Sequence, residues 1–265
     1  MGKQIAFFKK NKADFADSAV LLTASEGSLY APFVQRRSNN IGWMTTGSMD
    51  ASNTTLTCDF SNLQRLTDII LVNHNFKAFT VKYWDGSAYQ DFTPAVNETT
   101  NVDSTSRFSF ATVDTTKIQV RITGTQVANS EKKLTQLIAT ELIGQLSAWA
   151  LIKKPTHNRN KRDSTMLSGK HFIGENVGGF SVDLSVSYLT FDTDLTLMET
   201  LYGSGSGFLV WLCGGDEAQF RTKRIGYRLQ DIYLMKCKND YIPEWYASVY
   251  TTGVNITVQL VEVTN

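Results

Sequence analysis

The segment that decides the fold of the N-terminal half is TTLTCDF (Thr54–Phe60), in which threonines alternate with Leu56, Cys58 and Phe60. A period of two places the apolar side chains on one face of a β-strand. Clusters of Gly, Asn, Asp and Ser separate the runs that follow, and Asp85-Gly86 is typical of a hairpin turn. These further runs are Asp68–Val72, Phe79–Trp84, Phe108–Ala111, Lys117–Ile122 and Leu137–Leu142. We therefore predict an antiparallel all-β domain.

The C-terminal half has a different pattern. The run FSVDLSVSYL (Phe180–Leu189) alternates strictly, and Leu195, Met198, Leu201 and Tyr202 then recur at helical spacing up to Gly203. Four more strands are expected over 208–213, 226–237, 245–251 and 255–263. The order of these elements predicts an α+β split barrel with a single helix.

The length of 265 residues suits two domains of about 150 residues each, and 42% apolar residues suffice for two cores. We predict an N-terminal arm over 1–18, a jelly-roll sandwich over 19–145 and the split barrel over 146–265. The protein is thus expected to be mainly β.

Composition excludes several classes of function. A net charge of +1 gives no whole-chain argument for nucleic acid or an anionic membrane. Cys58, Cys213 and Cys237 are far apart and match no metal-ligand spacing, which favours reduced thiols in a cytoplasm. No apolar run has transmembrane length, so we expect no membrane insertion.

Candidate catalytic groups are scarce. His74, His157 and His171 are the only histidines, and none has zinc spacing. The GSGSG segment (203–207) has glycine where a nucleophile elbow needs serine, and Asp192 and Asp194 are where a helix start favours acids. We predict that the chain is not an enzyme and holds neither a metal nor a cofactor.

A basic segment covers 153–171. It contains one acid, Asp163, and six basic residues: Lys153, Lys154, Arg159, Lys161, Arg162 and Lys170. Such a cluster can neutralise phosphates, but it lacks the interleaved aromatics that stack on bases. The alternatives are a solvated loop or hairpin and an arm that contacts a neighbouring subunit; we expect the subunit contact and no nucleic acid.

Loop aromatics raise the question of sugar binding. Trp43 and Trp84 are near predicted loops, and His74 is at a predicted strand end. The alternative for Trp43 is burial just before a strand, and for Trp84 a position before a hairpin turn. These three residues are the candidate glycan contacts.

The run from Trp43 to Gly47, the segments DIILVNHNF (68–76) and FTVKYWDGSAYQDF (79–92), and KIQVRITGT (117–125) together resemble the galactose-binding-like (discoidin-type) jelly roll. The resemblance covers about residues 15 to 144. It implies the fold of this half.

The second half resembles the tail-tube-like fold of long-tailed bacteriophages. The resemblance is carried by FSVDLSVSYL, DTDLTLMETLYGSGSG, FLVWLCGG, GYRLQDIYLMKC and NITVQLVEV. It implies a structural virion component at the distal tail or tail tip, assembled in the host cytoplasm. The implied partners are copies of the chain in a ring (hexamer or trimer) and other tail proteins. In the implied assembly, the hairpin over 153–171 reaches a neighbour. The alternative function is a carbohydrate-binding module that attaches to host-surface glycans.

Overall fold

The computed structural model describes residues 5–14, 19–36, 41–47, 50, 52–146, 150–165, 171–189, 193–205, 207–212, 232–238, 240–247 and 252–263. They form two compact units. The sandwich unit is Lys10–Leu142, and the sheet unit combines Met1–Lys9 with Ile143–Asn265. The N-terminal residues, predicted as an arm over 1–18, are therefore divided between the two units.

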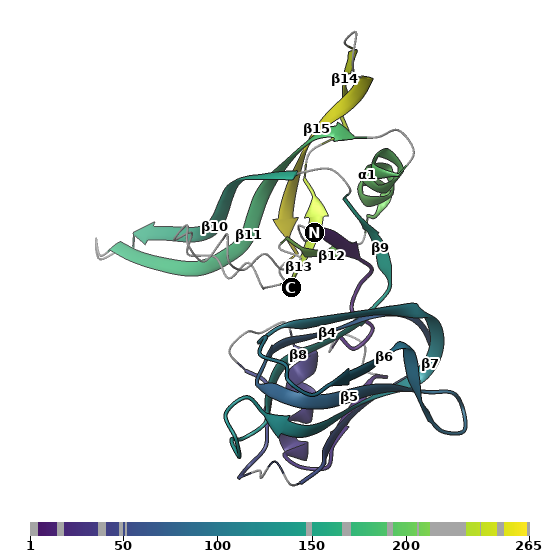
Figure 1. Ribbon diagram of the computed structural model, residues 1–265. Helices are drawn as coiled ribbons and strands as arrows, with labels where there is room; N and C mark the ends of the chain where they lie inside the picture. The colour runs from purple at the N-terminus through teal and green to yellow at the C-terminus, as the bar shows by residue number, and fades with distance from the viewer. Residues whose placement is uncertain are drawn as a thin grey trace. The chain divides into compact units, whose positions relative to one another are not determined.

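The described residues of the sandwich unit form antiparallel strands and one 3-10 helix (Figure 1). The elements are β2 (Leu21–Ala24), η1 (Ser28–Gln35), β3 (Trp43–Met44), β4 (Thr54–His74), β5 (Phe76–Trp84), β6 (Tyr89–Glu98), β7 (Ser106–Thr125) and β8 (Lys133–Thr140). This confirms the predicted antiparallel β architecture of the N-terminal half.

Two long strands, β4 and β7, take part in both layers of the sandwich. The first part of β4, Thr54–Asp59, pairs with β2 and with the second part of β7. After an irregularity, the second part of β4, Asp68–His74, pairs with β8 and with the first part of β7. One layer is therefore β2-β4-β7-β5-β6 and the other is β3-β8-β4-β7. Irregularities of this kind bend a strand and let one chain segment serve both sheets.

The alternation in the sequence produces the core between these layers. Along Thr54–Phe60 every second side chain is buried, as the period of two predicts. Leu56, Phe60, Phe79 and Ile122 belong to one continuous apolar cluster with exposures of 0–1%. Their burial removes apolar surface from water, which is the main favourable contribution to folding of such a unit.

The sheet unit is an eight-stranded antiparallel sheet with one α-helix among its described residues. The strand order is β10-β11-β15-β13-β12-β1-β9, and β14 pairs with β15. The bounds are β1 (Ala6–Phe8), β9 (Leu142–Gln145), β10 (Ala150–Thr165), β11 (His171–Leu189), α1 (Asp194–Gly203), β12 (Phe208–Trp211), β13 (Ile232–Cys237), β14 (Glu244–Ala247) and β15 (Thr252–Glu262). The helix ends at Gly203, as predicted. Residues 213–231, which include Cys213 and the start of a predicted strand, are outside the described ranges.

The short strand β1 joins the sheet across nearly the whole sequence. Phe7 pairs with Val210 of β12, and its ring makes an edge contact with Phe208 at 5.8 Å. On its other side, Ile5 O accepts a hydrogen bond from Leu146 N. In the sequence, the sandwich unit is therefore an insertion between the first strand of the sheet unit and the remaining residues of the sheet unit.

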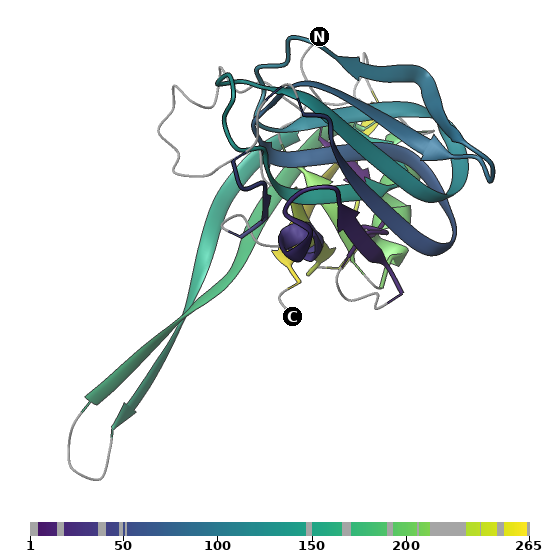
Figure 2. The ribbon, with the colours of Figure 1, turned by 90° about the horizontal axis from the view of Figure 1, so that it is seen from below.

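Residues 153–165 of the basic segment belong to β10, which pairs with β11 in a long hairpin (Figure 2). The two strands pair from Ala150↔Val186 to Thr165↔His171. In contrast, β15 pairs with β11 only over Ser181–Leu189. From Phe180 outward, the described hairpin strands pair with each other alone.

Candidate ligand-binding pocket

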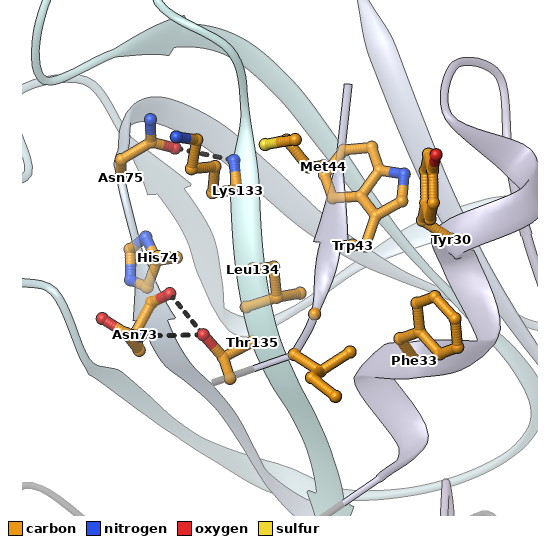
Figure 3. A pocket seen from close by; sticks show the side chains of 12 residues that line it. Tyr30, Phe33, Trp43, Met44, Asn73, His74, Asn75, Lys133, Leu134 and Thr135 are labelled. Atoms are coloured by element: carbon orange, nitrogen blue, oxygen red, sulfur yellow. Dashed lines mark hydrogen bonds between the residues drawn. The ribbon is translucent and has the colours of Figure 1, made fainter. Parts of the chain in front are cut away.

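The sandwich unit contains a pocket of about 540 Å³. Four segments enclose it: η1, the loop into β3, the turn from β4 to β5, and the start of β8 (Figure 3). The lining residues are Tyr30, Phe33, Ile41, Gly42, Trp43, Met44, Asn73, His74, Asn75, Lys133, Leu134 and Thr135. This volume falls within the usual range for small-ligand sites, roughly 300–1,000 Å³.

Glycines fix the wall made by η1 and β3. Gly27 precedes η1 with φ of 64°, and a Cβ there would collide with the carbonyl oxygen of Met44. The indole Nε1 of Trp43 donates to Glu26 O at 2.9 Å, which holds the start of η1 against β3. A Cβ on Gly42 would likewise meet the backbone of Leu134. Only glycine permits this close approach of η1, β3 and β8.

Asparagines fix the opposite wall. Asn73 has φ of 52°, a left-handed conformation that asparagine adopts more readily than most residues. Its Nδ2 donates to Thr135 Oγ1 at 2.9 Å, and Thr135 Oγ1 donates back to Asn73 O. Asn75 Oδ1 accepts from Lys133 N at 2.8 Å, and its Nδ2 donates to Glu131 O at 2.7 Å. The turn from β4 to β5 is thus tied to the start of β8.

His74 is a neutral, structural member of this wall. Its Nδ1 accepts a hydrogen bond from Phe76 N at 3.1 Å, and its Nε2 is 3.0 Å from Ser106 Oγ. Since Nδ1 is the acceptor, the ring proton is on Nε2 and is donated to the serine. Burial lowers the pKa of His74 to about 4, so the ring carries no charge near neutral pH.

The two sides of the pocket differ in chemistry (Figure 3). One side is apolar and partly open: Tyr30 is 42% exposed and Ile41 is 49% exposed, with Phe33 half-buried beside them. The Tyr30 and Phe33 ring centroids are 6.1 Å apart. The other side carries the exposed polar side chains of Asn73 and Lys133. A ligand in this pocket would meet an aromatic surface on one side and hydrogen-bonding groups on the other.

The structure brings together two of the three predicted glycan residues. Trp43 and His74 both line the pocket, although they are only 1% and 3% exposed. Trp84 does not line it. This residue is on the β5–β6 hairpin, where its ring meets Tyr89 edge-on at 5.1 Å. No observation tests a sugar contact of these residues, so their role stays a prediction.

Other lining residues were not among the predicted site residues. Tyr30 and Phe33 belong to an eight-residue 3-10 helix that contains Pro32, where no helix was predicted. Lys133 is one of two consecutive lysines with no distinguishing pattern. Only tertiary contacts place these residues opposite Asn73.

The predicted subunit-contact residues Lys153, Lys154, Arg159, Lys161 and Arg162 all belong to β10, for which the structure describes the backbone. Lys170 is outside the described residues. Their contact with a neighbour therefore stays a prediction.

Other groups in the described part of the chain offer little chemistry. No cluster of three or more His, Cys, Asp or Glu side chains there could hold a metal ion. Burial raises the pKa of the Cys58 thiol, and that of Cys237 to about 11, so both are protonated near neutral pH. None of the described helices has the length and apolarity to span a bilayer.

Comparison with known proteins gives matches to solved structures only. No protein-family model matches the sequence, and no curated protein matches it. A chitosan-binding module from a Paenibacillus chitosanase/glucanase is 12% identical, with a TM-score of 0.41, over 50% of this chain and 98% of the module. A Clostridium perfringens carbohydrate-binding module (CBM32), in complex with GalNAc-β-1,3-galactose, is 11% identical, with a TM-score of 0.39, over 46% of this chain and 96% of the module.

A third similar structure is a fucosidase from Ruminococcus gnavus. It is 10% identical, with a TM-score of 0.42, over 50% of this chain and 27% of the enzyme. Similarity at this level does not indicate which ligand, if any, the present chain binds.

Proposed function

We propose that the sandwich unit is a binding module that holds a saccharide in the pocket between η1 and the β4–β5 turn. The observation that carries the proposal is the half-exposed Tyr30 ring on one side of a 540 Å³ pocket, with Asn73 and Lys133 on the other. Pyranose rings have apolar C–H faces and hydroxyl-rich edges. They suit a pocket with an aromatic side and an amide and ammonium side.

The same pocket does not favour catalysis. Both nitrogens of His74 are occupied, and no carboxylate is among the twelve lining residues. General acid–base hydrolysis of a glycosidic bond ordinarily needs a pair of carboxyl groups flanking the bond. The lining therefore supports binding without turnover.

A glycan array on the full chain, followed by titration calorimetry with the best ligand, tests this function. Tyr30→Ala should weaken binding about tenfold or more, because it removes the open aromatic surface and costs at least ~1.4 kcal/mol of binding free energy. The matched control is Tyr89→Ala, which alters the aromatic pair on the β5–β6 hairpin. Saccharide binding that survives Tyr30→Ala but is lost in Tyr89→Ala would place the site at Trp84 instead.

For the sheet unit we propose a second role, assembly into a ring as a component of a phage tail. The observation that favours it is the far part of the β10–β11 hairpin, which pairs with no other described strand. A strand edge of this length presents unpaired N–H and C=O groups that can add to another sheet. The described sheet also ends in a second edge at β9, so a head-to-tail contact between copies could close into a ring.

Native mass spectrometry and electron microscopy of the full chain test assembly. The matched variant shortens the hairpin by joining Arg159 to Val177, which are register partners, through an Asn-Gly turn. We expect rings from the parent chain and monomers from the shortened one. A parent chain that stays monomeric at high concentration, and is absent from purified tails, contradicts this role. The saccharide proposal would be unaffected.

A further inference from the structure

The charge of the pocket points to a narrower class of ligand. Among the twelve lining residues, Lys133 is the one that carries a formal charge, since His74 is neutral. A second cation is close by: the guanidinium carbon of Arg36 is 4.9 Å from the centroid of the Phe33 ring, which lines the pocket. Positive charge without a lining carboxylate favours an anionic ligand.

The side chains of the two consecutive lysines, Lys132 and Lys133, lie in different environments. Lys132 is 0% exposed, and its ammonium donates to Ser52 O at 2.6 Å and to Thr54 Oγ1 at 2.7 Å. Successive residues of an extended chain point to opposite faces, so Lys132 enters the core while Lys133 lines the pocket. The ammonium of Lys132 is therefore used inside the protein, and that of Lys133 can serve a ligand.

Lys133 has a fixed backbone and a weakly held side chain. Its backbone N–H donates to Asn75 Oδ1, and it pairs with Met44 of β3. Its ammonium is 3.6 Å from Glu131 Oε2, in an ion pair whose side chains are 55% and 43% exposed. Solvent screens such exposed pairs, and they contribute little to stability. A ligand carboxylate can therefore take the place of Glu131 at small cost.

We infer that the saccharide is an acidic one, with a sugar carboxylate at the ammonium of Lys133 and a C–H face of the ring on Tyr30 and Phe33. This inference rests on the proposed saccharide function of the pocket. Neutral sugars would make the aromatic contact and the hydrogen bond to Asn73 but would leave Lys133 with Glu131. The pocket should therefore discriminate by charge rather than by ring shape.

Titration calorimetry with two matched pairs of probes tests this. The pairs are trigalacturonic acid against its carboxyl-reduced, neutral counterpart, and 3′-sialyllactose against lactose. In at least one pair the acidic member should bind about tenfold more tightly at 50 mM salt. The difference should shrink at 300 mM salt, because salt screens exposed charges.

Two variants locate the effect. Lys133→Gln should lower the affinity for the acidic probe to that of its neutral partner. The control is Lys82→Gln, because Lys82 is also in an exposed ion pair, 3.2 Å from Asp91 Oδ1, but does not line the pocket. This control should bind both probes as the parent chain does.

The outcomes separate the two proposals. Equal affinity for acidic and neutral members, or a preference that Lys133→Gln leaves intact, overturns the inference. Binding of a neutral glycan from the array, with no binding of either acidic probe, also overturns the inference but leaves the saccharide function standing. Absence of any glycan binding overturns both.

Discussion

The sandwich unit and the sheet unit differ in how their buried polar side chains are hydrogen-bonded. In the sandwich unit, buried polar side chains form hydrogen-bonded networks: Asp68, 1% exposed, accepts from Arg107 Nε at 2.8 Å and from Ser109 Oγ at 2.6 Å. In the described part of the sheet unit, the buried Tyr241 OH and Asn255 Oδ1 have no hydrogen-bond partner. Satisfied networks specify one arrangement of a core, whereas an unsatisfied buried group destabilises it.

The same contrast extends to the strands. In the sandwich unit, the first part of β4 pairs with β2 and β7, and its second part pairs with β8 and β7, so both edges of this long strand are used within the unit. In the sheet unit, the far part of β10–β11 runs beyond its neighbour β15. A pocket held by hydrogen bonds within one unit is suited to bind a small ligand, whereas hairpin strands that pair with no other described strand of their unit are suited to bind another chain.

The largest expected effect comes from breaking a buried network in the sandwich unit. Asp68→Ala removes the carboxylate that Arg107 and Ser109 contact, and should lower the free energy of unfolding of this unit by about 3 kcal/mol or more. Hydrogen exchange of β4 measures this as a roughly hundredfold loss of protection. Exchange of β15, in the other unit, should change little.

The matched control is another carboxylate of β4. Asp59 Oδ2 is 2.7 Å from Lys117 Nζ, but the two side chains are 29% and 39% exposed. Asp59→Ala should therefore lower the unfolding free energy by at most about 1 kcal/mol. If Asp59→Ala and Asp68→Ala lowered the unfolding free energy equally, the buried network around Asp68 would contribute no more than an exposed ion pair. The contrast between the polar groups of the two units would then fail.

A second effect, which reaches a similar size only near pH 4 and is smaller above it, should come from acid, through His74. Its folded-state pKa of about 4 is below the ordinary value of 6.5, so between these values the unfolded chain binds the extra proton. The contribution of His74 to stability is therefore fully present above pH 6.5 and is lost as the pH falls toward 4. At 1.36 kcal/mol for each pH unit, the loss approaches about 3 kcal/mol.

Titration of the histidine ring protons by NMR measures this pKa directly, and His74→Gln identifies the signal. The protection of β4, corrected for the intrinsic exchange rate at each pH, should fall over the same pH range in the parent chain, because the ionising residue is at the end of that strand. A His74 signal that titrates near 6.5 would show that its ring is not held neutral by burial.

Sequence patterns predicted what depends on local periodicity. The alternation in Thr54–Phe60, the Asp85-Gly86 turn and the helix end at Gly203 were all predicted and are all present. Asp85 Oδ1 accepts from Ser87 N and Ala88 N, as a turn aspartate does. Each of these features has its cause within a few residues of chain.

What the sequence did not predict depends on distant partners. Strand β1 is three residues long and pairs with residues about two hundred positions away, so no local period marks it. The pocket joins Tyr30, Asn73 and Lys133, which are brought together by the two layers and by the close approach at Gly27 and Gly42. Within Asn73–Asn75, the sequence pointed to His74 as a candidate glycan contact and to the jelly-roll resemblance, but not to the hydrogen bonds by which the two asparagines hold this turn against β8.

The smallest expected effect on stability concerns the hairpin of the sheet unit. The apolar core of this unit is drawn from α1 and from strands such as β12 and β15, and its described members on β11 are Val182, Leu184 and Val186. All three are on the part of β11 that pairs with β15. Joining Arg159 to Val177 through an Asn-Gly turn should therefore change the unfolding free energy by no more than about 0.5 kcal/mol.

Hydrogen exchange of β15 and α1 measures this in the shortened chain, at a concentration where the parent chain is monomeric. Unchanged protection would show that the hairpin is dispensable for folding, so that its length has to be explained by contacts outside the unit. A large loss of protection in β15 would mean that the hairpin stabilises its own sheet. The contrast between a long strand paired on both sides within its unit and a hairpin that extends beyond its unit would then fail.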